Sequence, residues 1–310
     1  MTEHGDRRSV GVGHDDTVTD SAIADWGERS VSYRGYDVLD LVRESTFTEV
    51  VYLLLYGDLP EEIFLADFRA VLAAASDGND WSDESAWMSD LLDRLPLNVP
   101  LTEILRTSVS ALAHFDPQPS DRSEDADLAR TVRLLGRMPM VLGSRLAVIR
   151  GEEPIDPDPE RSFPAQLAEQ LTGSVPSPLL ERALEVLLIS VVDVGFSPAV
   201  QAARLAAAAG ADLYGAVLAA AAIESTADRG GLAERLVSLW DERPWEDDAE
   251  GWVLERLDAG LGVPGSVFGG QAAFDPRCEI VAAWAEHLAA ESGSESIAEV
   301  DRAAAELELA

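Results

Sequence analysis

The chain has 310 residues, of which 57 are acidic and 23 basic, so its formal net charge is −34. That balance leaves no basic stripe to neutralise a nucleic-acid backbone, and no apolar run is long enough to cross a membrane. All the basic side chains are arginine, and the lack of lysine excludes a phosphate-binding P-loop and a lysine Schiff base.

The acidic excess is typical of a protein adapted to concentrated salt. Like charges in such number repel one another at low ionic strength and weaken the folded state. At molar salt the Debye length falls to about 3 Å, which screens this repulsion. Cys278 is the only cysteine, so no intrachain disulfide can form, and we expect a cytoplasmic location. Its thiol is predicted to be a small packed hydrophobic group, and the alternative is a nucleophile.

The first structured elements are expected after residues 1–16, which are polar and predicted to be a disordered lead-in. β-Branched residues and a turn near Gly27 predict a small β-hairpin within residues 17–32. Thr46 and Glu49 have the spacing of a capping box that begins a helix, and Gly57 is placed to end it. Beyond this point the pattern is helical.

Periodic apolar residues, with glycines and prolines at their ends, predict the remaining helices. These helices are expected at residues 64–75, 83–95, 102–114, 128–149, 166–171, 178–193 and 275–290. Pro139 should kink the longest of them. The alanine-rich stretch 199–223 is predicted to form two closely packed helices, with Asp212 as the N-cap of the second. The fold class is therefore all-α, with one small N-terminal β-hairpin.

Several short segments, in order along the chain, resemble motifs of the citrate synthase family. Residues 33–37 (Tyr-Arg-Gly-Tyr-Asp) resemble a turn near its N-terminus, and residues 52–60 resemble the end of one of its helices. Similar segments follow at 105–110, 150–152, 156–158, 193–196, 202–204, 212–214 and 275–277. Their order and spacing extend the resemblance over residues 17–290.

This resemblance implies a citrate-synthase-like architecture and chemistry. Family members are all-α dimers whose large domain (here residues 17–228) and small domain (here 229–310, truncated relative to the family) close over a cleft. They condense acetyl-CoA or a similar acyl-CoA with oxaloacetate. A carboxylate removes a proton from the thioester methyl group, one histidine stabilises the enolate, and another polarises the keto group. The resemblance implies no additional cofactor and no metal.

The positions that would carry this chemistry differ in the present chain. Where the family motifs have histidines, the sequence has Val194, Arg229 and Gly265. The sequence also ends before a segment that would match the catalytic aspartate, so we expect the base to be missing. One positioned acid or base contributes roughly 10²–10⁴-fold to a rate, and we therefore assign no catalytic residue. The remaining histidines, including His114 and His287, are expected to have surface or structural roles.

Two arginines are the candidate binding residues. Arg277 matches the family arginine that binds a substrate carboxylate. A guanidinium is suited to this role because it can donate two parallel hydrogen bonds to a carboxylate. Arg229 would supply a second cation in the cleft. The alternative interpretation is that both arginines pair with the abundant surface acids.

Three functional hypotheses follow from this pattern. The first is a protein that has lost catalysis and acts as a binding or oligomeric partner. It would be a homodimer or a heteromer with an active paralogue, and its ligand would be a CoA ester or a dicarboxylate. The second is an active citrate or 2-methylcitrate synthase that uses new catalytic groups drawn from Asp193, Asp228 and Arg229. The third is a structural helical partner that binds no ligand.

Overall fold

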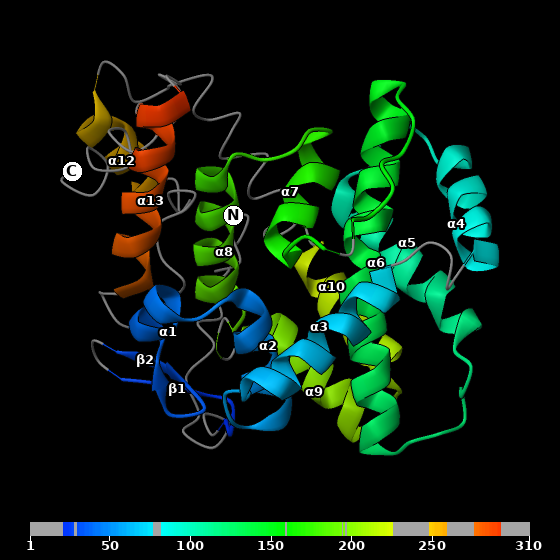
Figure 1. Ribbon diagram of the computed structural model, residues 1–310. Coiled ribbons are helices and arrows are strands. Elements are labelled where there is room, and N and C mark those ends of the chain that lie inside the picture. Colours follow the sequence, from blue (N-terminus) through cyan, green and yellow to red (C-terminus); the bar gives the residue numbers. More distant parts are fainter. Residues whose placement is uncertain are drawn as a thin grey trace, which may run out of the picture.

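The structure is a computed structural model, and it describes residues 21–27, 30–76, 82–158, 160–193, 195, 197–225, 248–258 and 276–292. Within these residues the chain is mostly helical, with one three-stranded sheet near its start (Figure 1). The strands are β1 (Ala24–Trp26), β2 (Val31–Tyr33) and β3 (Tyr36–Asp37). The helices are α1 (Val38–Glu44), α2 (Phe47–Tyr56), α3 (Glu62–Ser76), α4 (Ser82–Arg94), α5 (Leu101–Leu112), the 3-10 turn η1 (Ala113–Phe115), α6 (Glu124–Arg150), α7 (Phe163–Thr172), α8 (Pro178–Val191), α9 (Pro198–Ala208), α10 (Leu213–Glu224), α12 (Ala249–Asp258) and α13 (Pro276–Ser292). The predicted all-α class is confirmed.

The N-terminal sheet contains the predicted hairpin and one strand that was not predicted. Strands β1 and β2 pair antiparallel, and β3 pairs antiparallel with β2. The β2–β3 turn consists of Arg34 and Gly35, which both have positive φ angles (51° and 87°). A two-residue turn of this kind matches the twist of the paired strands. The Arg34 side chain donates to the carbonyl oxygen of Leu54 at 3.0 Å, which ties the turn to α2.

Helix α2 begins and ends as the sequence predicts. The Thr46 side chain accepts from the amide of Glu49, and the Glu49 carboxylate accepts from the amide of Thr46 at 2.7 Å. Gly57 closes the helix in the left-handed conformation (φ 99°), which costs glycine little because it has no Cβ. Helix α1, just before it, was not predicted.

Helix α6 is the longest element and packs against α3, α4, α5 and α7. It begins at Ser123, whose side chain accepts from the amide of Ala126, and it continues through Pro139. The predicted start at residue 128 was therefore one turn late. A Cβ atom at Gly136 would lie 2.8 Å from the backbone of Ala75, so glycine at this position allows the close approach of α3.

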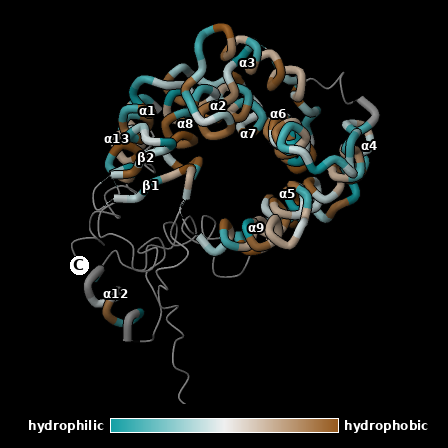
Figure 2. Tube along the Cα trace, turned by 90° about the horizontal axis from the view of Figure 1, so that it is seen from below, coloured by the Kyte–Doolittle hydropathy of each residue, from teal (hydrophilic) through white to brown (hydrophobic). Residues whose placement is uncertain are grey.

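Two apolar clusters form the core. The first joins the sheet with α1, α2, α3 and α8, and Ile280 and Trp284 of α13 pack against it. The second joins α4, α5, α6 and α10. Seen from below, the helices form an arc from α13 and α1 through α3 and α6 to α5 and α9 (Figure 2). The predicted domain division at residue 228 stays a prediction.

The alanine-rich stretch forms two helices that pack closely against each other, as predicted. Helices α9 and α10 are separated at Gly210, which has a positive φ of 89°. Asp212 caps α10 by accepting from the amide of Gly215 at 2.7 Å. In the described part of the chain, no helix is long and apolar enough to cross a membrane.

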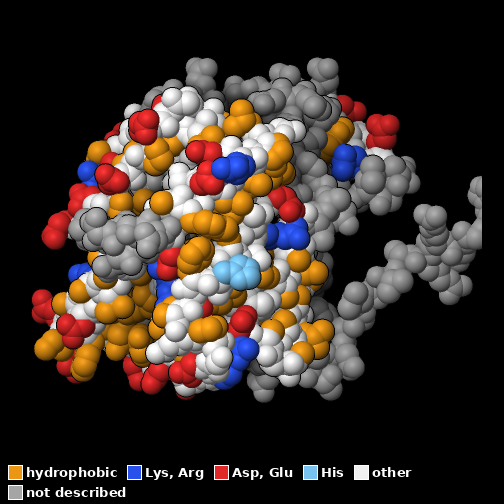
Figure 3. Space-filling view, turned by 90° about the vertical axis from the view of Figure 1, so that its right-hand side faces the viewer, with side chains coloured by type: hydrophobic (Ala, Val, Ile, Leu, Met, Phe, Trp, Pro, Cys, Tyr) orange, Lys and Arg blue, Asp and Glu red, His pale blue; other side chains and the backbone are white. Residues whose placement is uncertain are grey.

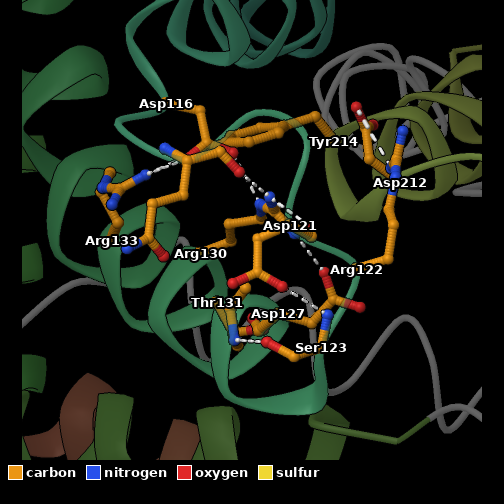
Figure 4. Close-up of polar contacts among 12 residues, drawn as sticks. Asp116, Asp121, Arg122, Ser123, Asp127, Arg130, Thr131, Arg133, Asp212 and Tyr214 are labelled. Carbon is orange, nitrogen blue, oxygen red and sulfur yellow. Dashed lines mark hydrogen bonds and ion pairs between the residues drawn. The ribbon is translucent and has the colours of Figure 1, made fainter.

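A buried polar network joins the loop before α6 to α10 (Figure 4). Arg130, only 1% exposed, donates to the carboxylate of Asp116 at 2.6 Å and to that of Asp127 at 2.8 Å. Arg133 contacts Asp116 at 3.4 Å and donates to the Tyr214 hydroxyl at 3.0 Å. The network fixes the loop because the buried guanidinium needs these partners to offset its desolvation.

Candidate functional site

Arg277 lies where three separate parts of the fold meet. It is in the first turn of α13, yet its Nη1 atom donates to the carbonyl oxygens of Ser190 and Asp193, both at 2.8 Å. These carbonyls belong to the end of α8 and to the segment after it, where the last carbonyl groups of a helix have no partner within the helix. The same nitrogen lies 3.4 Å from the Tyr33 hydroxyl of β2.

Tyr33 supports this junction from the sheet. Its side chain is fully buried, and its hydroxyl lies 3.2 Å from the carbonyl oxygen of Ser190. Burial raises the pKa of the Tyr33 phenol, although the hydrogen bond from Arg277 opposes that shift. The phenol therefore stays protonated at neutral pH and can donate to the carbonyl.

Trp26 of β1 covers the face of the Arg277 guanidinium. The Cζ atom of Arg277 lies 4.4 Å from the centre of the indole ring, within the range of a cation–π contact. The same ring lies against Gly195, where an added Cβ would be 3.0 Å from Cε2 of Trp26. Gly195 also has a φ of 68°, so both its conformation and its surroundings favour glycine.

Asp193 orders the segment that follows α8. Its Oδ1 atom accepts from the amide of Gly195 at 2.7 Å, which forms a local turn. Its carbonyl oxygen accepts from Arg277. The segment that matches the family's histidine-bearing loop is thus tied to α13 by a guanidinium. Such a contact also satisfies the negative end of the α8 dipole.

The predicted site residues are only partly within the described part of the chain. Val194, Asp228, Arg229 and Gly265 lie outside it, so their predicted positions at the family's histidine motifs stay predictions. Arg277 lies inside it, and the contacts given above are made with two backbone carbonyl oxygens, a tyrosine hydroxyl and an indole ring. Its assignment as a carboxylate-binding residue also stays a prediction.

His114 and His287 are both exposed, as expected for surface residues. Cys278 is also exposed, so the prediction of a packed thiol was wrong. An amphipathic pattern places a residue on a helix face, and it does not say whether another element covers that face. In the described residues, no group of histidine, cysteine, aspartate or glutamate could hold a metal ion.

Two cavities lie away from Arg277. One, of about 460 Å³, lies between α3 and α6, and Arg133 and Arg137 are among its lining residues. The other, of about 630 Å³, is lined by α4, α5 and α10 together with His114. Figure 3 shows the face over α4 and α5, where hydrophobic side chains gather beside a histidine. Neither cavity contains a residue that the sequence motifs single out for substrate binding.

Trp26 and Tyr33 are site residues that sequence reasoning did not identify. Tyr33 stands in the Tyr-Arg-Gly-Tyr-Asp motif, which was noticed only as a turn. Trp26 belongs to no motif, and its partner Arg277 is far away in the sequence. Only the folded chain brings the two side chains together.

The fold and the Arg277 junction define an all-α protein built around one long helix, with a small N-terminal sheet. The family described as "Citrate synthase, C-terminal domain" matches residues 13–310. The chain therefore belongs to the citrate synthase family.

Relatives and solved structures agree with this assignment. A citrate/2-methylcitrate synthase of Bacillus subtilis is 32% identical over 239 residues, which cover 77% of this chain and 63% of that protein. A citrate synthase of Haloferax volcanii is 30% identical over 267 residues, which cover 84% of this chain and 69% of that protein. The present chain thus spans less than two thirds of the length of the Bacillus protein.

Among solved structures, the citrate synthase of Pyrobaculum aerophilum matches with a TM-score of 0.78 and 24% identity over 92% of this chain and 73% of that one. The citrate synthase of Thermoplasma acidophilum, in a ternary complex with carboxymethyl coenzyme A and oxaloacetate, matches with a TM-score of 0.83 and 22% identity. That match covers 95% of this chain and 76% of the other. At these identities the structures establish the fold alone.

Proposed function

We propose that this chain keeps the citrate synthase scaffold without the condensation chemistry, and that it acts as a binding or oligomeric partner. One feature of the sequence carries the proposal: Val194, Arg229 and Gly265 are the residues that we match to the histidine positions of the family motifs. Valine and glycine have no titratable side chain, and the arginine side chain stays charged, so none of these residues can shuttle a proton near neutral pH or act as a neutral imidazole donor to an enolate. Weak carbon acids need such groups around the reacting atoms.

The test is CoA release from acetyl-CoA and oxaloacetate in molar KCl. The Haloferax volcanii citrate synthase, measured in the same buffer, is the positive control. The proposal predicts no release above the rate without protein. A turnover above about 1 s⁻¹, which is within the ordinary range of enzymes, would overturn it.

The ligand that we propose is a dicarboxylate or a CoA ester. Arg277 supports a carboxylate ligand because a guanidinium can bind carboxylate through two parallel hydrogen bonds. Arg229 is proposed as a second cation. The Thermoplasma acidophilum neighbour was solved with carboxymethyl coenzyme A and oxaloacetate, which supports testing these two classes first. A ligand that binds the native state raises the melting temperature, so a thermal-shift screen separates this proposal from a ligand-free structural role.

The proposed assembly is a homodimer or a heteromer with an active paralogue. Leu205 of α9 is 73% exposed, and alanines precede and follow it by one turn along the helix, at Ala202 and Ala208, which supports helix packing against another subunit. The single cysteine supports a cytoplasmic location. Light scattering in molar KCl measures the mass of the particle, and a monomer at all concentrations would contradict the homodimer.

An active citrate or 2-methylcitrate synthase is the second candidate, and the Bacillus subtilis relative favours it. In that case Asp193, Asp228 or Arg229 would replace the family's groups. Activity with acetyl-CoA or propionyl-CoA should then be abolished by Arg229→Ala. Unchanged rates in that variant would argue against Arg229 as the replacement.

A further inference from the structure

We propose that Trp26 is a positioning residue for Arg277, whose guanidinium its indole ring holds in a fixed plane at the junction of β1, α8 and α13. The link to ligand binding rests on the proposed function, in which Arg277 contacts a carboxylate. The positioning itself is independent of any ligand. Trp26 belongs to none of the motifs that identify the family in this sequence.

The placement of Arg277 shows that its contacts depend on other elements. A cation in the first turn of a helix faces the positive end of the helix dipole, whereas the carboxyl end of a helix attracts it. Arg277 begins α13 but reaches the carboxyl end of α8. Three of its hydrogen-bond contacts meet at one atom, Nη1. They hold that atom, and the ring of Trp26, whose centre lies 4.4 Å from Cζ, restrains the plane of the guanidinium.

The surroundings of Trp26 indicate that the face of its ring is the part that matters. Its Nε1 atom is buried and has no hydrogen-bond partner in the described part of the chain, which is unfavourable for a polar group. The indole is therefore held in place by contacts with its ring. Gly195 provides the room, because a side chain there would meet the ring at 3.0 Å.

A guanidinium held in one plane is better prepared to bind a carboxylate. Immobilising a long side chain on binding has an entropic cost, and prior restriction of that side chain reduces the cost. The N-terminal sheet would thus influence ligand binding at Arg277, although its strands make no part of the family motif that contains the arginine. Trp26 acts through Arg277 and does not need to touch the ligand itself.

The first experiment needs no ligand. In the full chain labelled with ¹⁵N-arginine and kept in molar KCl, the guanidinium resonance that disappears in Arg277→Lys belongs to Arg277. The ring current of Trp26 should displace this resonance, and Trp26→Leu should return it to the range of the other arginines. Trp26→Phe is the matched control, because it keeps an aromatic face while it removes the unpaired N–H and part of the ring area. An unchanged resonance in folded Trp26→Leu would overturn the positioning role.

A second pair of variants tests the same contact if Trp26→Leu does not fold. Gly195→Ala should move the ring without changing either Trp26 or Arg277, and it should shift the same resonance. Tyr33→Phe removes a hydroxyl beside Nη1 but leaves the ring stacking in place, so the displaced resonance should persist. A resonance that responds to Tyr33→Phe and not to Gly195→Ala would contradict the role of Trp26.

Calorimetric titration with oxaloacetate connects the inference to ligand binding. Trp26→Leu should weaken binding about fivefold, while Trp26→Phe should bind like the wild-type protein. Equal affinities for all three proteins would show that the stacking does not influence the ligand. If the wild-type protein bound no oxaloacetate, the proposed dicarboxylate function would fail, and the arginine resonances would still decide the positioning role.

Discussion

Asp116 is the carboxylate on which the loop between η1 and α6 depends. Burial raises its pKa, but hydrogen bonds from Arg130 and from the amide of Gln118, together with the charges of Arg130 and Arg133, outweigh burial. The net pKa lies below the ordinary value. Asp116 therefore stabilises the fold at pH values above its unfolded pKa of about 3.9, and this contribution is lost as the pH falls through the lower, folded pKa.

We expect Asp116→Asn to lower the free energy of unfolding at pH 7 by about 3 kcal/mol, because it breaks a buried ion pair and leaves Arg130 short of a charge partner. The difference between variant and wild type should narrow below pH 4, where the wild-type carboxylate takes up a proton. Asp127→Asn is the control. The Asp127 side chain also pairs with Arg130 but is 47% exposed. Its replacement should therefore lower the free energy of unfolding by less than about 1 kcal/mol. Urea unfolding between pH 7 and pH 2 measures the free energy of unfolding of both variants and of the wild type. A difference between Asp116→Asn and the wild type that stayed constant down to pH 2 would contradict the role of the Asp116 charge.

At the scale of single residues, the sequence predicted local contacts well and distant ones poorly. The Thr46–Glu49 capping box and the Asp212 cap were foreseeable, because donor and acceptor are three residues apart. The hydrogen bond between Arg277 and Tyr33 joins residues 244 positions apart. A family motif indicated that Arg277 matters, but no local pattern could name the ring and the carbonyl groups that hold it.

At the scale of elements, the close approach of α3 and α6 depends on Gly136. A methyl group there would lie 2.8–2.9 Å from backbone atoms of Ala75 and Ser76, which cannot rotate away. Overpacking of this kind costs about 1–3 kcal/mol, while replacing glycine by alanine in a helix returns up to about 1 kcal/mol. Gly136→Ala should therefore lower the free energy of unfolding by about 1 kcal/mol, as measured by urea denaturation.

Gly143→Ala probes a second close approach on the same helix. Its new methyl group would overlap Oε1 of Gln170, a buried side chain that donates to the carbonyl oxygen of Ile155 at 3.0 Å, so this variant should lose stability as well. Adding Gln170→Ala should recover part of the loss at Gly143 and none of the loss at Gly136. Recovery of both losses would show that the backbone contact at Gly136 is not the cause. Both variants should keep the far-ultraviolet circular dichroism of the wild-type chain.

Long helices with a clear apolar face were the elements that the sequence predicted best. Helix α1 has seven residues, which is too short for the 3.6-residue period to stand out from the neighbouring strands. Strand β3 has two residues and depends on the turn at Arg34 and Gly35. Helix α12 lies in a strongly acidic stretch whose charges obscure the apolar period. For α1 and β3 the missing information was tertiary packing.

At the scale of the whole molecule, the net charge of −34 opposes folding. At 0.1 M salt the Debye length is about 10 Å, so acids on neighbouring helices repel one another; at 1 M it is about 3 Å. We expect the melting temperature to rise steeply between these two KCl concentrations. Buried pairs are screened much less than surface pairs, so the Arg130–Asp116 pair, whose side chains are 1% and 5% exposed, should persist in molar salt while surface repulsion fades.

Sucrose separates this screening from general solvent effects, because it favours the compact state by exclusion from the protein surface and carries no charge. The melting temperature should respond far more strongly to KCl than to sucrose at the same osmolality. The stabilisation should also level off once the Debye length is shorter than the spacing of surface acids. Equal responses to the two solutes would mean that charge repulsion is not what limits the folded state, and the acidic surface would then need an explanation other than adaptation to salt.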